Sequence, residues 1–375
     1  MTSKTSKALK INITNGDNYD EDWTFDGDTC TYEELQSVFN KPCTLLTSKK
    51  IFSDKKYILH LDATRETDPS IVIASNTSVD ILKLSGSQLA KTNELNLAAE
   101  EECVGTKFAP MDSNLVYIAC SKANIKLYDL RTPEKPVSEF IDSTVNDKNN
   151  KTFLSFDVSP DNKLVTAGTE LFDADAFVLF WDVRNANLLG AYWESHTDDV
   201  MQVKFHAEDR NKLLSASTDG LINMYNLKEA SEDDALTECL NTESSVEQIA
   251  WCNEEVFCAT HTHNVQMWRL EDATPYGDFK REILSQHIKR KCDDYNYVAG
   301  CFVDKEQPVI LFGSNFKDGE CLRALAVDGK QLRPLFDCRG NSQRVRSARF
   351  DPQSRILMTG GEKGIIDVWK LDCIS

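Results

Sequence analysis

Histidine and cysteine, the residues that most often carry chemistry, are irregularly spaced in this sequence. His261 and His263 form the closest histidine pair, and Cys258 is the cysteine nearest to them. A structural zinc site needs four ligands, so this set is incomplete and no metal is expected. The pair is interpreted as two turn residues. None of the twelve cysteines stands in the C-x-x-C spacing of a thiol redox site.

Motifs of the common catalytic classes are also absent from the sequence. It contains no nucleophile elbow G-x-S-x-G, no phosphate-binding loop with its lysine, no G-x-G-x-x-G and no H-E-x-x-H. We therefore expect a protein that is not an enzyme and that uses no cofactor.

The composition narrows the class of partner. The chain has 375 residues, of which 41% are hydrophobic and 27% are charged, so it can bury a large core. Its 60 acidic residues outnumber its 42 basic residues and give a net charge of −18. Direct binding to nucleic acid or to an anionic membrane needs a cationic surface, so neither is expected. A basic protein or peptide remains as the expected partner.

Signals for membrane insertion and export are missing as well. No run approaches the ~18 consecutive apolar residues of a transmembrane helix. The first ten residues lack the apolar segment of a secretory signal peptide. We therefore expect an intracellular protein of the cytoplasm or the nucleus, with reduced cysteines. A monomer is the expected state.

Residues 1–41 differ from the rest in composition and are expected to form an acidic arm. Between Asp17 and Glu34 there are eight acidic residues and no lysine or arginine. Thr31 and Glu34 have the spacing of a capping box, which predicts a short helix over residues 32–40. The arm is expected to be partly disordered. The alternative is a segment that docks on this protein or on a basic partner.

The remaining residues, 42–375, contain a repeat. Seven short segments alternate apolar and polar residues, and a large apolar or aromatic residue recurs at one position of each, at intervals of 43 to 57 residues. A period of about 40–45 residues is typical of a four-stranded propeller blade, and the longer intervals indicate inserted loops. The recurring residues are Leu82, Tyr128, Trp181, Tyr225, Trp268, Leu325 and Trp369.

The fourth unit shows the pieces of a blade most clearly, with a tight Asp219-Gly220 turn between its second and third strands. We therefore predict one all-β domain, a seven-bladed propeller. Blade seven would lack its outer strand, so residues 43–47 are expected to supply it and close the ring. The expected strands of the fourth unit are 200–205, 213–217, 221–227 and 236–240.

Blade four and the pair Trp181-Asp182 resemble the WD-repeat family. In that family a His, a Ser or Thr, an Asp and a Trp of one blade form a hydrogen-bonded set, and such a buried set stabilises only when every member has a partner. The resemblance assigns these roles, in blade four, to His196, Ser217, Asp219 and Tyr225, the last in place of Trp.

A narrower resemblance covers residues 167–184, 189–192 and 195–200, together with Thr359-Gly-Gly-Glu362 before Trp369. These stretches are similar to one orthologous group within the WD-repeat family. WD-repeat proteins are typically interaction platforms, so the resemblance implies a non-catalytic scaffold.

The resemblance also implies where a partner binds. In WD propellers the turns between the second and third strands share a face with the blade-to-blade connections. The acidic loops of blades three and four would then meet as a binding site for a basic segment, while Lys55, Lys56, Arg339, Arg344 and Lys363 would form a basic half. The alternative is an ordinary solvated rim. The candidate binding residues are Glu170, Asp173, Asp175, Glu194, Asp198, Asp199 and Asp219.

A second feature suggests a different function. Trp181-Asp182-Val183-Arg184 resembles the W-D-x-R box of WD proteins that act as substrate receptors of cullin-4 ubiquitin ligases. Arg184 would then contact the ligase adaptor from the opposite face. The leading hypothesis is an acidic platform that binds or escorts a basic protein, and the ligase receptor is the alternative.

Overall fold

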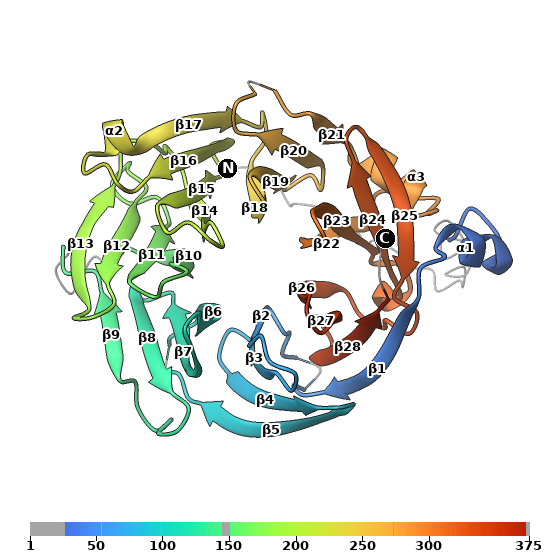
Figure 1. The fold of residues 1–375 in the computed structure, drawn as a ribbon, viewed down its shortest axis with the longest axis horizontal. Helices are drawn as coiled ribbons and strands as arrows, with labels where there is room; N and C mark the ends of the chain where they lie inside the picture. The colour runs from blue at the N-terminus through green and yellow to red at the C-terminus, as the bar shows by residue number, and fades with distance from the viewer. Residues whose placement is uncertain (1–26, 54, 99, 145–150, 273, 373–375) are drawn as a thin grey trace, which may run out of the picture.

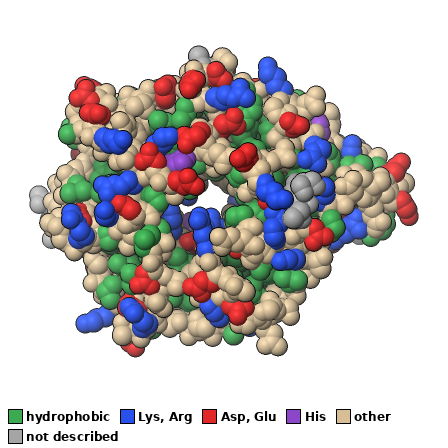
Figure 2. Space-filling view, viewed as in Figure 1, with side chains coloured by type: hydrophobic (Ala, Val, Ile, Leu, Met, Phe, Trp, Pro, Cys, Tyr) green, Lys and Arg blue, Asp and Glu red, His purple; other side chains and the backbone are tan. Residues whose placement is uncertain are grey.

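The computed structural model describes residues 27–372, apart from residues 54, 99, 145–150 and 273. These residues form seven antiparallel sheets of four strands, arranged as blades around a central opening (Figure 1). The predicted seven-bladed all-β propeller is confirmed. Figure 2 shows the hole at its centre, with acidic and basic side chains around it.

In blades 1 to 3 the strands follow one another in the chain from the centre outwards. Blade 1 consists of β2 (His60–Ala63), β3 (Ser70–Ala74), β4 (Val79–Ser85) and β5 (Gln88–Leu95). Blade 2 consists of β6 (Cys103–Ala109), β7 (Asp112–Cys120), β8 (Asn124–Asp129) and β9 (Ser138–Ile141). Blade 3 consists of β10 (Phe153–Val158), β11 (Leu164–Thr169), β12 (Val178–Asp182) and β13 (Asn187–Tyr192).

Blades 4 to 6 repeat this order, and blade 7 contributes three strands in sequence. Blade 4 consists of β14 (Val200–Phe205), β15 (Lys212–Ser217), β16 (Leu221–Asn226) and β17 (Leu236–Asn241). Blade 5 consists of β18 (Val246–Cys252), β19 (Glu255–Thr260), β20 (Val265–Arg269) and β21 (Gly277–Phe279). Blade 6 consists of β22 (Asn296–Asp304), β23 (Gln307–Ser314), β24 (Cys321–Asp328) and β25 (Gln331–Asp337). The three strands of blade 7 are β26 (Val345–Asp351), β27 (Ile356–Gly361) and β28 (Ile365–Leu371).

The recurring large residue lies on the third strand of every blade and is buried between neighbouring sheets. All seven of these side chains are at most 4% exposed. Burial of such a side chain contributes roughly 1.5–3 kcal/mol, so the repeat position marks the core contact of each blade. Because a single sheet cannot cover both of its faces, stacking of the blades makes the core continuous.

Neighbouring blades are also joined at the innermost strands by one repeated hydrogen bond. A polar side chain of one blade accepts the backbone amide of the next: Asp62 from Phe108 at 2.9 Å and Asp157 from Phe205 at 2.8 Å. Gln202 accepts in the same way from the next blade. These side chains therefore satisfy amides that the inner edge of a sheet would otherwise leave unpaired.

The ring is closed by a strand from the other end of the described chain. β1 (Cys43–Lys50) lies antiparallel to β28, from the pair Cys43 and Leu371 to the pair Lys50 and Ile365. The strand expected at residues 43–47 corresponds to β1, which extends three residues further. Without β1, β28 would expose a free edge.

Residues 27–41 pack against the outside of blade 6, where Figure 1 shows α1 beside β25. The helix α1 (Tyr32–Val38) begins with the expected capping box of Thr31 and Glu34, and it ends two residues before the expected position 40. Leu35 and Phe39 are 5% and 4% exposed, within the apolar core of blades 5 and 6. The expectation of partial disorder in residues 1–26 lies outside the described residues.

A charged cluster holds the start of this segment. The Asp28 carboxylate binds Arg323 at 2.6 Å and Arg290 at 3.4 Å, and the Arg323 guanidinium lies over the Phe39 ring. Burial alone raises the pKa of Asp28, but the hydrogen bonds and charges of Arg323 and Arg290 lower it below its ordinary value. The described part of the acidic arm therefore docks on this protein, which was the alternative in the sequence analysis.

Two short helices were not expected from the sequence. α2 (Glu232–Ala235) lies between β16 and β17, and α3 (Arg281–His287) lies between blades 5 and 6. α3 accounts for the longest interval of the repeat, since it is inserted between Trp268 and Leu325. Each helix has too few residues to show a helical period in sequence.

Candidate protein-binding face

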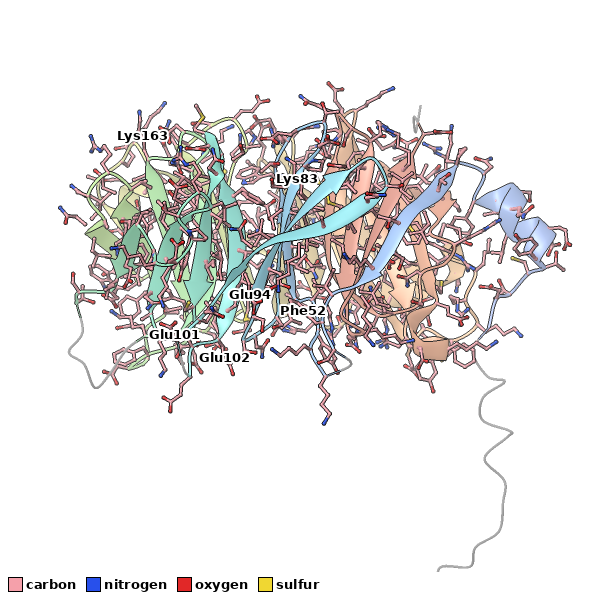
Figure 3. The ribbon with its side chains drawn as sticks, turned by 90° about the horizontal axis from the view of Figure 1, so that it is seen from below. Phe52, Lys83, Glu94, Glu101, Glu102 and Lys163 are labelled. Atoms are coloured by element: carbon pink, nitrogen blue, oxygen red, sulfur yellow. The ribbon has the colours of Figure 1, made fainter. Side chains whose placement is uncertain are left out.

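One end of every blade carries both its second turn and its connection from the preceding blade. In blades 2 to 7, the amide of the residue after the second strand donates to the carbonyl of the residue before the first strand. We call this side of the ring the connection face. Figure 3 shows Glu101 and Glu102 on this face, below, and Lys163 on the opposite one. The donor and acceptor pairs are Ser121–Glu102, Glu170–Thr152, Thr218–Asp199, His261–Ser245, Asn315–Tyr295 and Glu362–Arg344.

The buried polar set of blade 4 exists, but one of its predicted members is wrong. His196 Nδ1 lies 3.0 Å from the Asp219 carboxylate, and Nε2 lies 2.6 Å from the hydroxyl of Ser215, not of Ser217. The Ser215 hydroxyl in turn lies 3.2 Å from that of Tyr225. Ser217 instead donates to the carbonyl of Asp198 at 3.0 Å. The set is therefore His196, Ser215, Asp219 and Tyr225.

The correction has a geometric reason. Ser215 and Ser217 point to the same side of β15, because side chains alternate along a strand. Ser217 is the last residue of β15 and accepts the Asp219 amide at 3.1 Å, so it belongs to the turn. Ser215 lies deeper, where the buried Tyr225 reaches it.

The long loop of blade 3 is a tight hairpin rather than an open loop. Phe172 and Asp175 exchange two backbone hydrogen bonds of 2.8 and 3.0 Å, and Asp173 and Ala174 both have positive φ at the tip. This is the geometry of a two-residue turn of the type that suits a twisted hairpin. The hairpin presents Glu170, Asp173 and Asp175 as exposed side chains.

Of the seven predicted binding acids, three have structural roles. Asp219 belongs to the buried set, and its side chain is 6% exposed. Asp199 accepts the Leu171 amide at 2.8 Å and so ties the hairpin to blade 4. Asp198 accepts its neighbour's amide and is half-buried. Burial alone raises the pKa of Asp219, but His196 and the amides of Thr197 and Leu221 lower it below its ordinary value.

The other four acids remain available. Glu170, Asp173, Asp175 and Glu194 are exposed, and none of these carboxylates has a hydrogen-bond or ion-pair partner in the described part of the chain. They come from the blade 3 hairpin and from the connection that leaves the same blade. We call these four residues the acidic rim.

The acids of the connection between blades 1 and 2 behave differently. Glu101 is buried and binds the Lys126 ammonium at 2.6 Å. Glu100 lies 3.0 Å from Lys122, and the side chain of this acid is 84% exposed. Glu101 is thus a structural ion pair, whereas the Glu102 carboxylate is exposed and has no partner among the described residues, so this connection also carries free negative charge.

The predicted basic half lies partly on the same face. Arg344 is in the connection to blade 7, and Lys363 is in the turn of that blade, 3.3 Å from Asp318. Arg339 instead stacks on Tyr32 of α1, at 4.9 Å between guanidinium and ring centre. Lys56 donates to the Ser78 hydroxyl. Arg344 also lies 3.9 Å from Glu362, so within the expected basic half only the exposed Lys55 has no partner among the described residues.

A groove next to the acidic rim was not expected from the sequence. It has a volume of about 410 Å³, and Asp175, Phe177, Gly190, Ala191 and Trp193 contribute to its lining. Trp193 is 48% exposed, whereas the repeat-position tryptophans are buried. The signal available in the sequence was a tryptophan outside the repeated position, directly after an outer strand.

The backbone under Trp193 is held firmly by α2. One carboxylate, that of Glu232, accepts the amides of Trp193, Glu194 and Ser195 at 2.7, 3.0 and 2.9 Å. It also accepts the Ser195 hydroxyl. Three consecutive amides on one carboxylate fix the course of the connection, so Trp193 and Glu194 project from a defined position.

The W-D-x-R box forms a local ion pair on the opposite face. The Arg184 guanidinium binds Asp182 at 2.9 and 2.5 Å and lowers the pKa of that carboxyl to about 2. The Arg184 side chain is 78% exposed. Arg131 binds Asp129 in the same way in blade 2. Trp181 is fully buried and donates to the Ile141 carbonyl. The arginine therefore has the same local structural role in both blades.

No group of three or more His, Cys, Asp or Glu side chains within the described ranges is arranged to hold a metal ion. Among the same residues, none of the helices has the length and apolar character needed to cross a membrane.

A ring of seven four-stranded blades, closed by an N-terminal strand, defines this molecule as a β-propeller. The family called WD domain, G-beta repeat matches residues 188–226 and 332–370. Each match runs from the outer strand of one blade to the third strand of the next.

The chain is similar along most of its length to WD-repeat proteins. A WD repeat-containing protein of Saccharomyces cerevisiae is 32% identical over 308 residues, which cover 79% of this chain and 74% of the relative. The WD repeat-containing protein 89 homolog of Dictyostelium discoideum is 25% identical over 327 residues, 85% of this chain and 84% of the relative. The narrower resemblance noted in the sequence is to that protein 89 group. The chain belongs to the WD-repeat family.

Proposed function

We propose that this chain is a protein-interaction scaffold whose acidic rim binds a basic protein or peptide. WD-repeat propellers are interaction scaffolds, which gives the coarse function. The observation that supports the finer one is the set of four exposed carboxylates on the blade 3 hairpin and on the connection that leaves blade 3, none of which has a partner among the described residues.

The physical argument concerns association rather than stability. Each exposed ion pair with a partner would contribute only ~0–1 kcal/mol. The potentials of neighbouring carboxylates add over about 8 Å, the Debye length at physiological salt. Such a field steers a basic segment toward the rim and raises its association rate. Binding of this kind weakens as salt concentration rises.

The test is a charge reversal with a matched control. Asp173→Lys, Asp175→Lys and Glu194→Lys should together leave the fold intact and abolish capture of basic partners. The control variant carries Asp68→Lys, Glu306→Lys and Asp328→Lys, three exposed acids on turns of the opposite face. Both variants change the net charge equally, so the control separates a local site from overall charge.

The measurement is affinity purification with mass spectrometry at low and high salt. The control should recover the basic partners of the wild type, and the rim variant should not. Recovery of all basic partners of the wild type by the rim variant would contradict the proposal that the acidic rim binds them. So would equal losses in both variants, because the effect would then come from net charge alone.

The alternative function, substrate receptor of a cullin-4 ubiquitin ligase, depends on Arg184. Its exposure is the feature that favours this function, but its guanidinium already binds Asp182, as Arg131 binds Asp129. Arg184→Ala should therefore leave capture of basic partners unchanged. Retention of a cullin-4 adaptor by the wild type, and its loss in Arg184→Ala, would favour the alternative.

A further inference from the structure

The groove beside the acidic rim combines an apolar floor with an exposed aromatic wall. Gly190 and Ala191 of β13 and Phe177 contribute small or flat surfaces, and Trp193 lines the same groove. Trp193 leaves about half of its side chain, 48%, in contact with solvent. A tryptophan that lines a groove and stands on a fixed backbone is the type of aromatic anchor that binding sites use.

The charges around the groove are unequal. Lys151 lines it, but the Lys151 ammonium is buried and already bound to Asp142 at 2.9 Å and to the Thr144 hydroxyl at 2.8 Å. Asp175 lines it too, and its carboxylate has no partner among the described residues. Glu194 is exposed directly after Trp193. Among the described residues, the lining of the groove thus offers unpaired negative charge and no unpaired positive charge.

The groove also already holds a cation against an aromatic ring. The Lys151 ammonium lies 4.2 Å from the centre of the Phe177 ring. This contact is a cation–π interaction, and tryptophan is the aromatic residue that makes the strongest ones. Trp193, on the solvent side of the groove, offers an aromatic ring for a second cation–π interaction.

These features together select one kind of side chain. A guanidinium is planar, stacks on an aromatic face and binds a carboxylate through two parallel hydrogen bonds. A lysine ammonium is a more strongly hydrated point charge and gains less from a flat aromatic wall. An uncharged aliphatic side chain would leave the Asp175 carboxylate unpaired.

We propose that the groove of Trp193 and Asp175 binds an arginine side chain of the basic partner. The guanidinium stacks on Trp193 and pairs with Asp175, and the acidic rim receives neighbouring basic residues. This inference rests on the proposed function, because it names the residue type that the acidic rim's partner inserts.

The test compares fluorescein-labelled nona-arginine and nona-lysine, titrated by fluorescence anisotropy at about 0.15 M salt. Non-specific attraction to an acidic protein treats the two peptides alike, whereas a stacking site prefers arginine. We expect nona-arginine to bind at least about fivefold more tightly. Trp193→Ala should weaken nona-arginine to the level of nona-lysine and leave nona-lysine nearly unchanged.

Two further variants make the test independent of Trp193 itself. Gly190→Leu fills the groove, and a Cβ at Gly190 meets no atom within 4 Å, so this variant should fold. It should remove the arginine preference as Trp193→Ala does. Tyr295→Ala is the control, because Tyr295 is an equally exposed aromatic (47%) on blade 6, and it should retain the preference.

The outcomes separate the inference from the proposed function. Equal affinity for the two peptides, or an arginine preference that survives both groove variants, would overturn the arginine groove. If the Lys-substituted rim variant of the preceding section then still lost both peptides, the acidic platform would stand. If that variant bound both peptides as the wild type does, both proposals would be wrong.

Discussion

His196 connects three parts of blade 4 through one ring. Its Nδ1 faces Asp219 in the turn, its Nε2 faces Ser215 in β15, and Ser215 reaches Tyr225 in β16. The His196 side chain is 1% exposed. A buried network of this kind is stabilising when all members are paired, and it is costly when one is removed.

Replacement of this histidine should therefore destabilise the propeller. In His196→Ala, the carboxylate of Asp219 and the hydroxyl of Ser215 each lose a partner, at roughly 1–3 kcal/mol for an unsatisfied buried group. For a chain of this size the melting temperature should fall by a few degrees. The measurement is differential scanning calorimetry, with His261→Ala, an exposed turn histidine, as the control. An unchanged melt would contradict the role of the network.

His263 makes stability depend on pH. Burial, and then the charges of Arg344, Arg281, His261 and Arg346, lower the pKa of His263 to about 4. Glu247 lies 3.7 Å from its Nδ1, which is not enough to reverse the shift. The unfolded chain binds a proton near pH 6.5, so it takes up more protons than the folded chain as the pH falls from about 6.5 to about 4.

The contribution of neutral His263 to the free energy of unfolding should thus be fully present above about pH 6.5 and decrease as the pH falls toward 4. His263→Asn should flatten part of this decrease, because asparagine does not titrate and tolerates the positive φ of +59° at this position. Urea unfolding at about pH 7 and about pH 5 measures the difference. His287→Asn is the control, because His287 is not among the groups that shift the pKa of His263. A wild-type slope that His263→Asn does not change would argue against this assignment.

Individual residues could be predicted correctly from the sequence where their spacing is typical of only one kind of structure. Trp181, Tyr225 and the other repeat residues mark the seven blades as predicted, because a large residue that recurs every 43 to 57 positions is typical of propeller blades. The prediction of Ser217 is wrong because Ser215 shares the same side of β15, and only depth in the blade distinguishes the two. Trp193 was missed, since its groove is built by segments distant in sequence.

At the scale of elements, the docked segment 27–41 depends on one buried guanidinium. The Arg323 side chain is 5% exposed and binds Asp28 and the Ile288 carbonyl, with Asp337 at 3.5 Å. Burial alone lowers the pKa of Arg323, but its hydrogen bond to Asp28 and the neighbouring Cys321 and Asp337 raise the pKa above its ordinary value. Arg323 thus remains charged, and Asp28 is its closest counter-charge.

Asp28→Ala should loosen the segment from blade 6. The variant leaves Arg323 with weaker partners, and the expected loss is about 1–3 kcal/mol for a charged group that loses its hydrogen bonds. Limited proteolysis should cleave between residue 27 and α1 faster than in the wild type. Glu33→Ala, an exposed acid of α1, is the control and should be cleaved at the wild-type rate. Identical rates for both would show that Asp28 does not hold the segment.

The sequence indicated α1 but not where it docks. The capping box of Thr31 and Glu34 is local, so it could be read directly. The basic residues that receive Asp28 lie about 260 positions or more away, at Arg290 and Arg323, and no local pattern links them. The same reason applies to α2, whose Glu232 fixes a connection of the preceding blade.

At the scale of the molecule, charge is distributed over the connection face by blade. The acidic rim lies on blade 3, whereas the three arginines around His263 come from blade 7 and from α3, next to blade 5. If a basic partner binds the acidic rim as proposed, this uneven distribution of charge orients the partner before contact. This arrangement could be predicted from the sequence only after the propeller fold had been predicted, because the loops are distant from one another along the chain.

Closure is the second property of the whole ring. Cys43 and Leu371 are paired across β1 and β28, and the Asp372 amide lies 3.3 Å from the Pro42 carbonyl. The two ends of the propeller are therefore close enough to be joined by a hairpin loop of about two to five residues. If the ring needs only one N-terminal strand that closes it, the blade at which this closure occurs should not matter.

A circular permutant tests this directly. The permutant joins Asp372 to Pro42 through a short Gly-rich loop and opens the chain between Gly86 and Ser87, both exposed, with no atom within 4 Å of a Cβ at Gly86. β5 then becomes the N-terminal strand and closes blade 1 on β4, as β1 closes blade 7 on β28. Since residues 1–41 are lost, the reference is the chain without them. We expect the same circular dichroism spectrum and a melting temperature within a few degrees of that reference. Aggregation of the permutant alone would mean that the pairing of β1 with β28 is specific, and that the blades are not interchangeable as sites of closure.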